Sequence, residues 1–318
     1  MAGWVPACSV LVRFDVPRAA SYTSAPIGKT REIKKRIKAV GNIRRITKTM
    51  QMIATAKFAA SNQRTLAAKP YSAAMLALVN EIAGGLDDVT HPLVDSGKGT
   101  REGKELTLIL TSDRGLCGPY NGSVLRCAIG LHRANPAVKA GVIELVGKKG
   151  AGFLKFNGVP IARLHNQFGD KPSYDAVDAL ASDYISRFIA GEISVVRVVS
   201  MRFISAGRQA PEVMQLLPFQ PPKTEAKATT GMRPLYEFSP QGKELLDDLL
   251  PAAVKATLFQ LFNEAVVSEH AARMIAMKAA TDNAGKSGKR LTLVYNRARQ
   301  AQITTELTEI ISGAAALG

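Results

Sequence analysis

The sequence contains few of the residues that catalytic and membrane chemistry require. Its 318 residues include three cysteines and four histidines, and none of them has the CxxC or clustered spacing typical of a metal site. So few cysteines cannot form the disulfide framework of a small secreted domain, which favours a reducing compartment. No run of about eighteen uncharged apolar residues is present, so we expect no membrane-spanning helix.

Acidic residues are also scarce. The chain has 26 Asp and Glu against 42 Lys and Arg, a formal net charge of +16, while 46% of its residues are apolar, which excludes wholesale disorder. An excess of this size predicts an acidic partner, which could be nucleic acid, anionic lipid or an acidic protein surface.

Residues 1–26 have the composition of an organellar transit peptide. Arg13 and Arg18 stand among Ala, Ser, Val and Leu, and Asp15 is the one acid. Targeting segments of this type are basic and poor in acids. The alternative is an ordinary N-terminus of the mature protein.

Residues 27–85 predict one long helix. Apolar residues recur every three or four positions from Ile33 to Ile82, and Gly84-Gly85 is a typical helix end. Between Lys29 and Lys69 twelve basic residues are opposed by Glu32 alone. A solvated helix face normally mixes both signs, so this uniform charge indicates contact with an acidic surface.

Residues 86–239 predict a small α/β domain with a largely parallel sheet, because strand and helix patterns alternate. The expected strands are 106–111, 142–146, 195–203 and 212–219, and the expected helices are 121–132 and 176–189. Residues 220–233, rich in Pro, Lys and Thr, are expected to form an exposed loop.

Residues 240–318 predict a second long helix that begins near Pro240 or Pro251. Gly285 and Gly288 weaken it, so either the helix bends there or a partner helix holds it straight. The last nine residues carry no side-chain charge, which suits an apolar sleeve. The predicted fold is α/β: a long antiparallel coiled coil of the N- and C-terminal helices with a central Rossmann-like domain.

No motif supports catalysis or a cofactor. Gly285-Lys286-Ser287 lacks the first glycine of a phosphate loop and lies in a helical pattern, and residues 147–152 read as a basic turn. Residues 112–118, SDRGLCG, follow a strand, yet no histidine nearby could activate Cys117. We interpret this segment as a structural turn and expect no catalytic, cofactor or metal residue.

Four segments resemble the gamma subunit family of rotary ATP synthases. They are residues 43–57 (IRRITKTMQMIATAK), residues 112–118, and the C-terminal runs 268–274 (SEHAARM) and 292–316. The resemblance implies a non-catalytic rotor shaft that stands inside the ring of alpha and beta subunits, with the α/β domain on the delta/epsilon foot subunits and the c-ring. Neither nucleic acid nor direct membrane contact is implied.

The resemblance also implies a set of contact residues. Those expected to meet the beta subunits or the apolar bearing are Lys48, Met50, Lys57, Arg273, Arg299, Gln300, Thr304, Ile310, Ile311 and Leu317. No cysteine follows Cys127, so the redox segment of chloroplast members is absent. Together with the transit-like start, this favours the matrix side of the mitochondrial inner membrane.

Two other classes of protein compete with this interpretation. A coiled-coil protein could bind nucleic acid along its basic helix and would then show steeply salt-dependent affinity, but that helix lacks interleaved aromatic residues. An enzyme with a nucleotide-binding α/β domain would need a phosphate loop or an acid/base pair, and neither is found.

Overall fold

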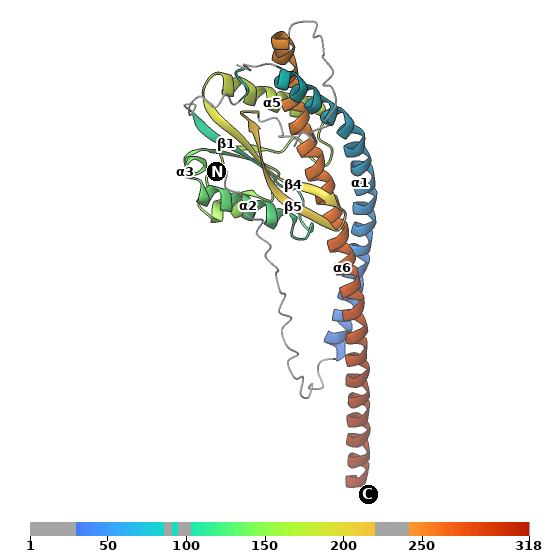
Figure 1. Cartoon of the computed structure of the whole chain (residues 1–318). Helices are drawn as coiled ribbons and strands as arrows, with labels where there is room; N and C mark the ends of the chain where they lie inside the picture. Colours follow the sequence, from blue (N-terminus) through green and yellow to red (C-terminus); the bar gives the residue numbers. More distant parts are fainter. Residues whose placement is uncertain (1–29, 86–90, 95–102, 220–241, 318) are drawn as a thin grey trace, which may run out of the picture. The chain divides into compact units, whose positions relative to one another are not determined.

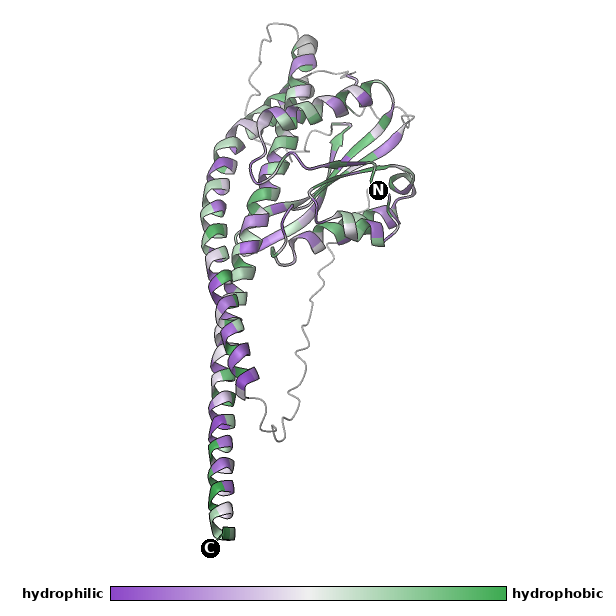
Figure 2. Cartoon of the chain, turned by 180° about the vertical axis from the view of Figure 1, so that it is seen from behind, coloured by the Kyte–Doolittle hydropathy of each residue, from purple (hydrophilic) through white to green (hydrophobic). Residues whose placement is uncertain are grey.

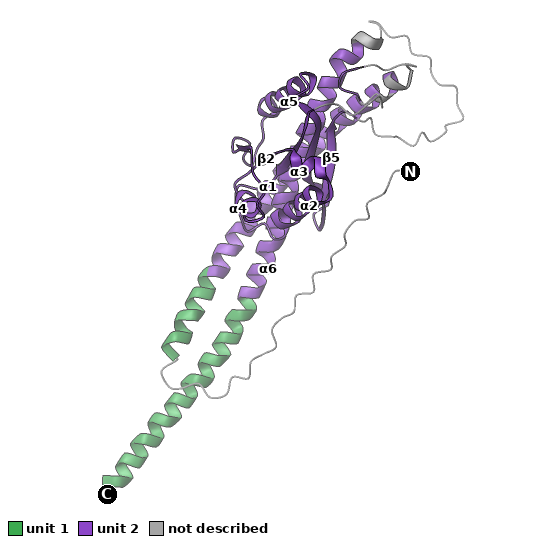
Figure 3. Ribbon diagram, turned by 90° about the vertical axis from the view of Figure 1, so that its left-hand side faces the viewer, with its two compact units in different colours: residues 1–42, 285–318 green, residues 43–284 purple. Residues whose placement is uncertain are grey.

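The computed structural model describes residues 30–85, 91–94, 103–219 and 242–317. The chain divides into two compact units, residues 1–42 with 285–318 and residues 43–284 (Figure 3). The predicted transit peptide 1–26 and the predicted loop 220–233 lie outside the described residues. The boundaries of the units fall inside the long helices, so the units do not coincide with the domains expected from sequence.

Both long helices are present. Helix α1 spans Thr30–Gly85 and ends at the predicted glycine, and helix α6 spans Gly242–Leu317 (Figure 1). Pro70 and Pro251 lie inside these helices, so Pro251 does not mark the start of α6. Within the described residues no helix has a stretch long and apolar enough to cross a membrane.

The two helices pair antiparallel in each unit. In the unit of residues 43–284, the Thr281 hydroxyl donates to Thr47 Oγ1 at 2.8 Å. In the other unit Thr30 Oγ1 donates to Gln302 Oε1 at 3.1 Å, and Gly288 lies opposite Val40. Helix α1 therefore lies against the part of α6 that contains Gly288. Of the two alternatives stated from the sequence, a bend in the helix or support by a partner helix, the second is the one observed.

The unit of residues 43–284 contains a five-stranded sheet of order β3-β2-β1-β4-β5. The strands are β1 Lys104–Leu110, β2 Val142–Val146, β3 Arg163–His165, β4 Ile193–Ser205 and β5 Arg208–Leu217. All neighbours pair parallel except β4 and β5. The connecting helices are α2 Tyr120–Ala134, α3 Pro136–Ala140, α4 Ala151–Phe156 and α5 Tyr174–Ile189. The mainly parallel sheet is confirmed, whereas β3, α3 and α4 were not predicted.

The sheet is buried on both faces. Leu106, Leu108 and Leu110 of β1 pack into a cluster with α5, the first part of α6 and the last turns of α1. Ile109 points the other way, into a cluster with α2 and α4. A parallel strand between two helical layers is mostly apolar, which explains why residues 106–110 of β1 are apolar except for the buried Thr107.

Glu144 is the more deeply buried of the two buried carboxylates that the structure describes in this unit. Glu144 of β2 is 2% exposed and accepts from Tyr184 Oη at 2.8 Å and Arg187 Nη1 at 3.2 Å, with His165 Nε2 at 2.7 Å. Burial raises the pKa of Glu144, but the hydrogen bonds from His165, Tyr184 and Arg187 outweigh it and hold the pKa below its usual value. This network joins β2, β3 and α5.

We predict that Glu144→Gln lowers the free energy of unfolding by about 3 kcal/mol at pH 7, because it breaks a buried ion pair. A carboxylate with a lowered pKa adds stability above its unfolded-state pKa, and that stability is lost as the pH falls through the folded-state pKa. The difference between variant and wild type should therefore shrink below about pH 4. Urea unfolding from pH 3 to 8 measures it, with exposed Asp248→Asn as the control. A difference independent of pH would contradict the assignment.

Candidate functional site

The crevice that binds ligands in many α/β proteins is filled in this chain. It lies at the carboxyl ends of the parallel strands, here beside Thr111, Gly147 and His165. Helix α6 places Phe262 and Glu269 against the same edge, and the remaining cavity measures about 30 Å³. That volume holds about one water molecule. Within the described residues, no group of three or more His, Cys, Asp or Glu could hold a metal ion.

Residues 112–118 form a tight turn after β1. Ser112 N–H donates to Asn121 Oδ1 at 3.0 Å, and Ser112 Oγ donates to the Arg114 carbonyl at 2.7 Å. Leu116 has a φ of +63°, and its side chain is exposed. Cys117 is buried and accepts from Asn121 Nδ2 at 3.2 Å. These bonds are those of a structural turn, as the sequence indicated.

Arg273 of α6 is buried and fastens this turn. It donates to Glu269 Oε1 at 2.6 Å, to the Arg114 carbonyl at 3.2 Å and to the Gly115 carbonyl at 3.3 Å. Its fourth contact is His270 Nδ1 at 3.3 Å. The donors of Arg273 are thus used inside the chain. We therefore assign Arg273 to the positioning of the turn, although the sequence suggested a partner contact.

Burial is the main influence on the pKa of His270, the histidine that contacts Arg273. Burial lowers the pKa of His270 most, Asp170 opposes it, and Arg273 adds to the lowering, so that the pKa is about 4. His270 is therefore neutral at physiological pH, so its Nδ1 can accept from Arg273.

Lys57 of α1 also has a partner inside the chain. It forms an ion pair with Asp170, whose Oδ2 lies 3.4 Å from Arg114 Nη1. Burial raises the pKa of Asp170, but Lys57 and then Arg114 outweigh it and keep the pKa low. Lys57, which was expected to contact the beta subunits, is therefore half-buried within the unit of residues 43–284.

Lys48 and Met50 lie on a part of α1 that is open to solvent. Lys48 is exposed and has no ion pair among the described residues, and Met50 is half-buried. Ile46, Met52 and Ile53 are exposed large apolar residues of the same stretch. This segment presents both positive charge and apolar surface.

The other unit exposes all the remaining expected residues. Arg299, Gln300, Thr304, Ile310, Ile311 and Leu317 are exposed. Ile310 is 67% and Leu317 93% exposed. Helix α6 continues past Gln302, the residue that contacts the first turn of α1, and its last turns are apolar (Figure 2). The described residues of this unit include ten basic and three acidic side chains.

Helices α1 and α6 thus present exposed apolar and basic side chains, beside an α/β layer with a mainly parallel five-stranded sheet. The ATP synthase family matches residues 29–317. An ATP synthase gamma chain of Rhodopirellula baltica is 40% identical over 297 residues, covering 90% of this chain and 98% of the relative. That of Leptospira biflexa is 38% identical over 290 residues, again covering 90% and 98%.

The chain belongs to the ATP synthase gamma-chain family. It is a non-catalytic subunit with a central-stalk role in ATP synthase. A solved structure, the OSCP/F1/c-ring assembly of the Euglena gracilis mitochondrial ATP synthase, contains a chain of the same fold. That likeness has a TM-score of 0.65 at 21% identity and covers 91% of this chain and 95% of the other. The two curated relatives are bacterial, so they do not support the narrower mitochondrial type.

Sequence reasoning missed Glu269 and Asp170, the partners of Arg273 and Lys57. The spacing of Glu269 and Arg273, four residues apart on one helix, is a recognisable signal for an ion pair. Asp170 follows β3 in a loop and gives no such signal, because its partners are distant in sequence.

We predict that Arg273→Ala lowers the free energy of unfolding by about 3–5 kcal/mol, because it leaves the buried Glu269 carboxylate without its partner. The double variant Glu269→Gln with Arg273→Met should lose clearly less, since no buried charge is left unpaired. Thermal and urea unfolding measure both. Arg290→Ala, at an exposed position of α6, should change stability by about 0.5 kcal/mol or less. Equal losses in the single and double variants would contradict the role of Arg273.

Proposed function

We propose that this chain is the rotor shaft that couples proton-driven rotation to conformational changes at catalytic sites on the beta subunits. The proposed partners are the alpha and beta subunits around the helix pair, and the delta/epsilon foot subunits and the c-ring at the α/β layer. Coupling of this kind requires that each angle of the shaft contacts the three sites differently, because a partner shifts an equilibrium only through differential interaction.

The observation that carries the proposal is the apolar end of α6. An isolated helix as short as residues 303–317 is marginally stable in water. These residues also expose the apolar side chains of Ile303, Leu307, Ile310 and Leu317. Such a surface gains stability only when a partner removes it from water. No charged side chain follows Glu309, so an apolar bearing can enclose the end without leaving a charge unpaired.

We further propose the contacts that meet the beta subunits. Arg299, Gln300 and Thr304 are free to do so, because they are exposed on α6 and the first has no ion pair among the described residues. Lys48 and Met50 supply a second contact on α1. Lys57 and Arg273 would act by holding the unit of residues 43–284 together rather than by direct contact.

The mitochondrial location is the finer part of the proposal. It rests on the composition of residues 1–26, which precede the family match at residue 29. We infer that this segment is a targeting peptide and that the mature chain lies on the matrix side of the inner membrane as part of the complex.

The shaft role predicts different effects for two double variants. Ile310→Lys with Ile311→Lys should prevent assembly of the complex, because it places two charges in the proposed apolar bearing. Arg299→Ala with Gln300→Ala should leave the complex assembled but lower its ATP synthesis about tenfold, through lost contacts that change with angle. Lys289→Ala, exposed on the same helix, serves as the control.

Both effects are measured on the membrane-bound complex, by subunit stoichiometry and by proton-driven synthesis. One copy of this chain beside three copies of each of two nucleotide-binding chains is the expected composition. Normal assembly of the lysine variant would rule out the bearing, and full synthesis by the alanine variant would rule out Arg299 and Gln300 as contacts.

The targeting proposal predicts that the chain purified from its source begins after residue 26. N-terminal sequencing of the native subunit tests this directly. A mature protein that still starts at Met1 or Ala2 would refute the transit peptide, and the mitochondrial location would then have no support from this chain.

A further inference from the structure

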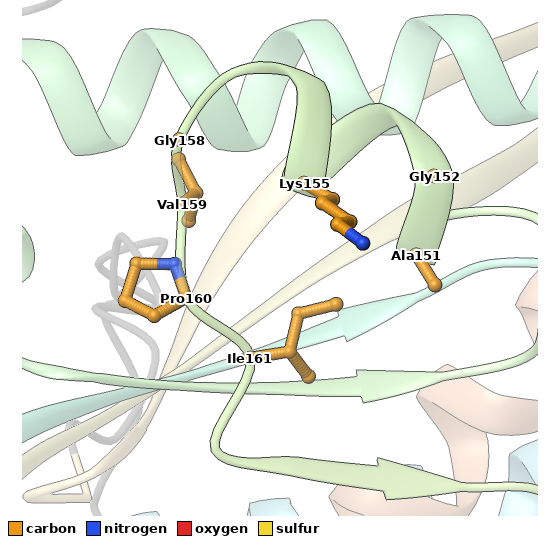
Figure 4. A pocket seen from close by; sticks show the side chains of 7 residues that line it. All are labelled: Ala151, Gly152, Lys155, Gly158, Val159, Pro160 and Ile161. Atoms are coloured by element: carbon orange, nitrogen blue, oxygen red, sulfur yellow. The ribbon is translucent and has the colours of Figure 1, made fainter.

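The connection between β2 and β3 carries an open apolar hollow on the outside of the sheet layer. It has a volume of about 480 Å³, and its lining includes Ala151 of α4 and Val159, Pro160 and Ile161 of the segment after α4 (Figure 4). The side chain of Lys155 extends beside these residues. The hollow therefore combines an apolar floor with one cation.

The surrounding sequence has one sign of charge. Residues 145–169 contain four basic residues and no acid. Arg163 lies 3.5 Å from Asp183. Lys148, Lys149 and Lys155 are exposed and form no ion pair with any described residue. The complementary surface must therefore be negatively charged.

Helix α4 also exposes an aromatic residue that the fold does not use. Leu154 is fully buried and anchors the helix to the sheet. Phe156, two residues later, is 89% exposed. Phe156 directly follows Lys155, which lines the hollow, and exposed aromatic residues often supply much of the binding energy of protein interfaces.

We propose that the α4 surface, formed by Ala151, Lys155, Phe156, Val159, Pro160 and Ile161, binds a segment of another subunit that carries a carboxylate next to an apolar side chain. The apolar side chain enters the hollow beside Phe156, and the carboxylate pairs with Lys155. This inference rests on the proposed function, since the partner belongs to the same complex. Nucleic acid or lipid headgroups would satisfy the lysines but leave Phe156, 89% exposed, in water.

The test uses the intact ATP synthase that contains this chain, with benzoylphenylalanine in place of Phe156. Illumination should link this chain to a protein subunit through a peptide that contains Asp or Glu next to an apolar residue. The control carries the same probe at Ile189, which is 58% exposed at the end of α5. A link to lipid, a link to a peptide without an acid, or a yield no higher than at Ile189 would overturn the proposal.

A second variant tests the charge. Lys155→Glu in the probe-bearing complex should reduce the yield of the cross-link about tenfold or more, as expected for loss of a central interface contact. Lys139→Glu, exposed on α3 and without an ion pair among the described residues, should leave the yield unchanged. Equal yields in the two variants would remove Lys155 from the interface.

The proposed function has a different test from the α4 surface. It is contradicted if the chain is absent from a complex with nucleotide-binding subunits. A complex that assembles normally but gives no specific link at Phe156 refutes only the α4 surface.

Discussion

The structure depends on how the burial of α6 changes along its length. Where α6 passes the sheet, residues such as Leu250, Val254 and Leu258 are fully buried and form part of the main core. Near its C-terminus the apolar residues of the same helix are exposed. The hydrophobic effect therefore stabilises one part of α6 within this chain and can stabilise the other only through a partner. The fold and the need for an assembly follow from one helix.

The same arrangement uses an α/β layer as part of a non-catalytic subunit. Fold class alone does not decide function, since many chemistries occur on similar sheets. In this chain α6 packs against the sheet with Leu250, Val254 and Leu258. Phe262 and Glu269 of the same helix line the small cavity at the carboxyl ends of the strands.

The predictability of each part follows its length and its contacts. The long helices and four strands show strong periodic or continuous apolar patterns, and all were found from sequence. Strand β3 has three residues and α4 six, too few to establish a period. The contact of Arg273 with a partner was implied by the resemblance and stays a prediction. The sequence alone does not indicate that this cation is buried beside Glu269 and the carbonyls of a distant turn. The exposed residues of α6 were identified by resemblance, and their exposure agrees with that role.

The ion pairs of the unit of residues 43–284, which are buried at Glu144 and Glu269 and half-buried at Asp170, are better understood as fixing geometry than as adding stability. The removal of charges from water costs about as much as their attraction returns, so an apolar contact would hold the unit together equally well. An ion pair differs in being directional, because a small displacement leaves a buried charge without its partner. Lys57 of α1 and Arg114 of the turn share Asp170, and Arg273 of α6 holds the carbonyls of the same turn. A displacement of either helix against the sheet would break one of these bonds, and such rigidity is what the proposed shaft role requires.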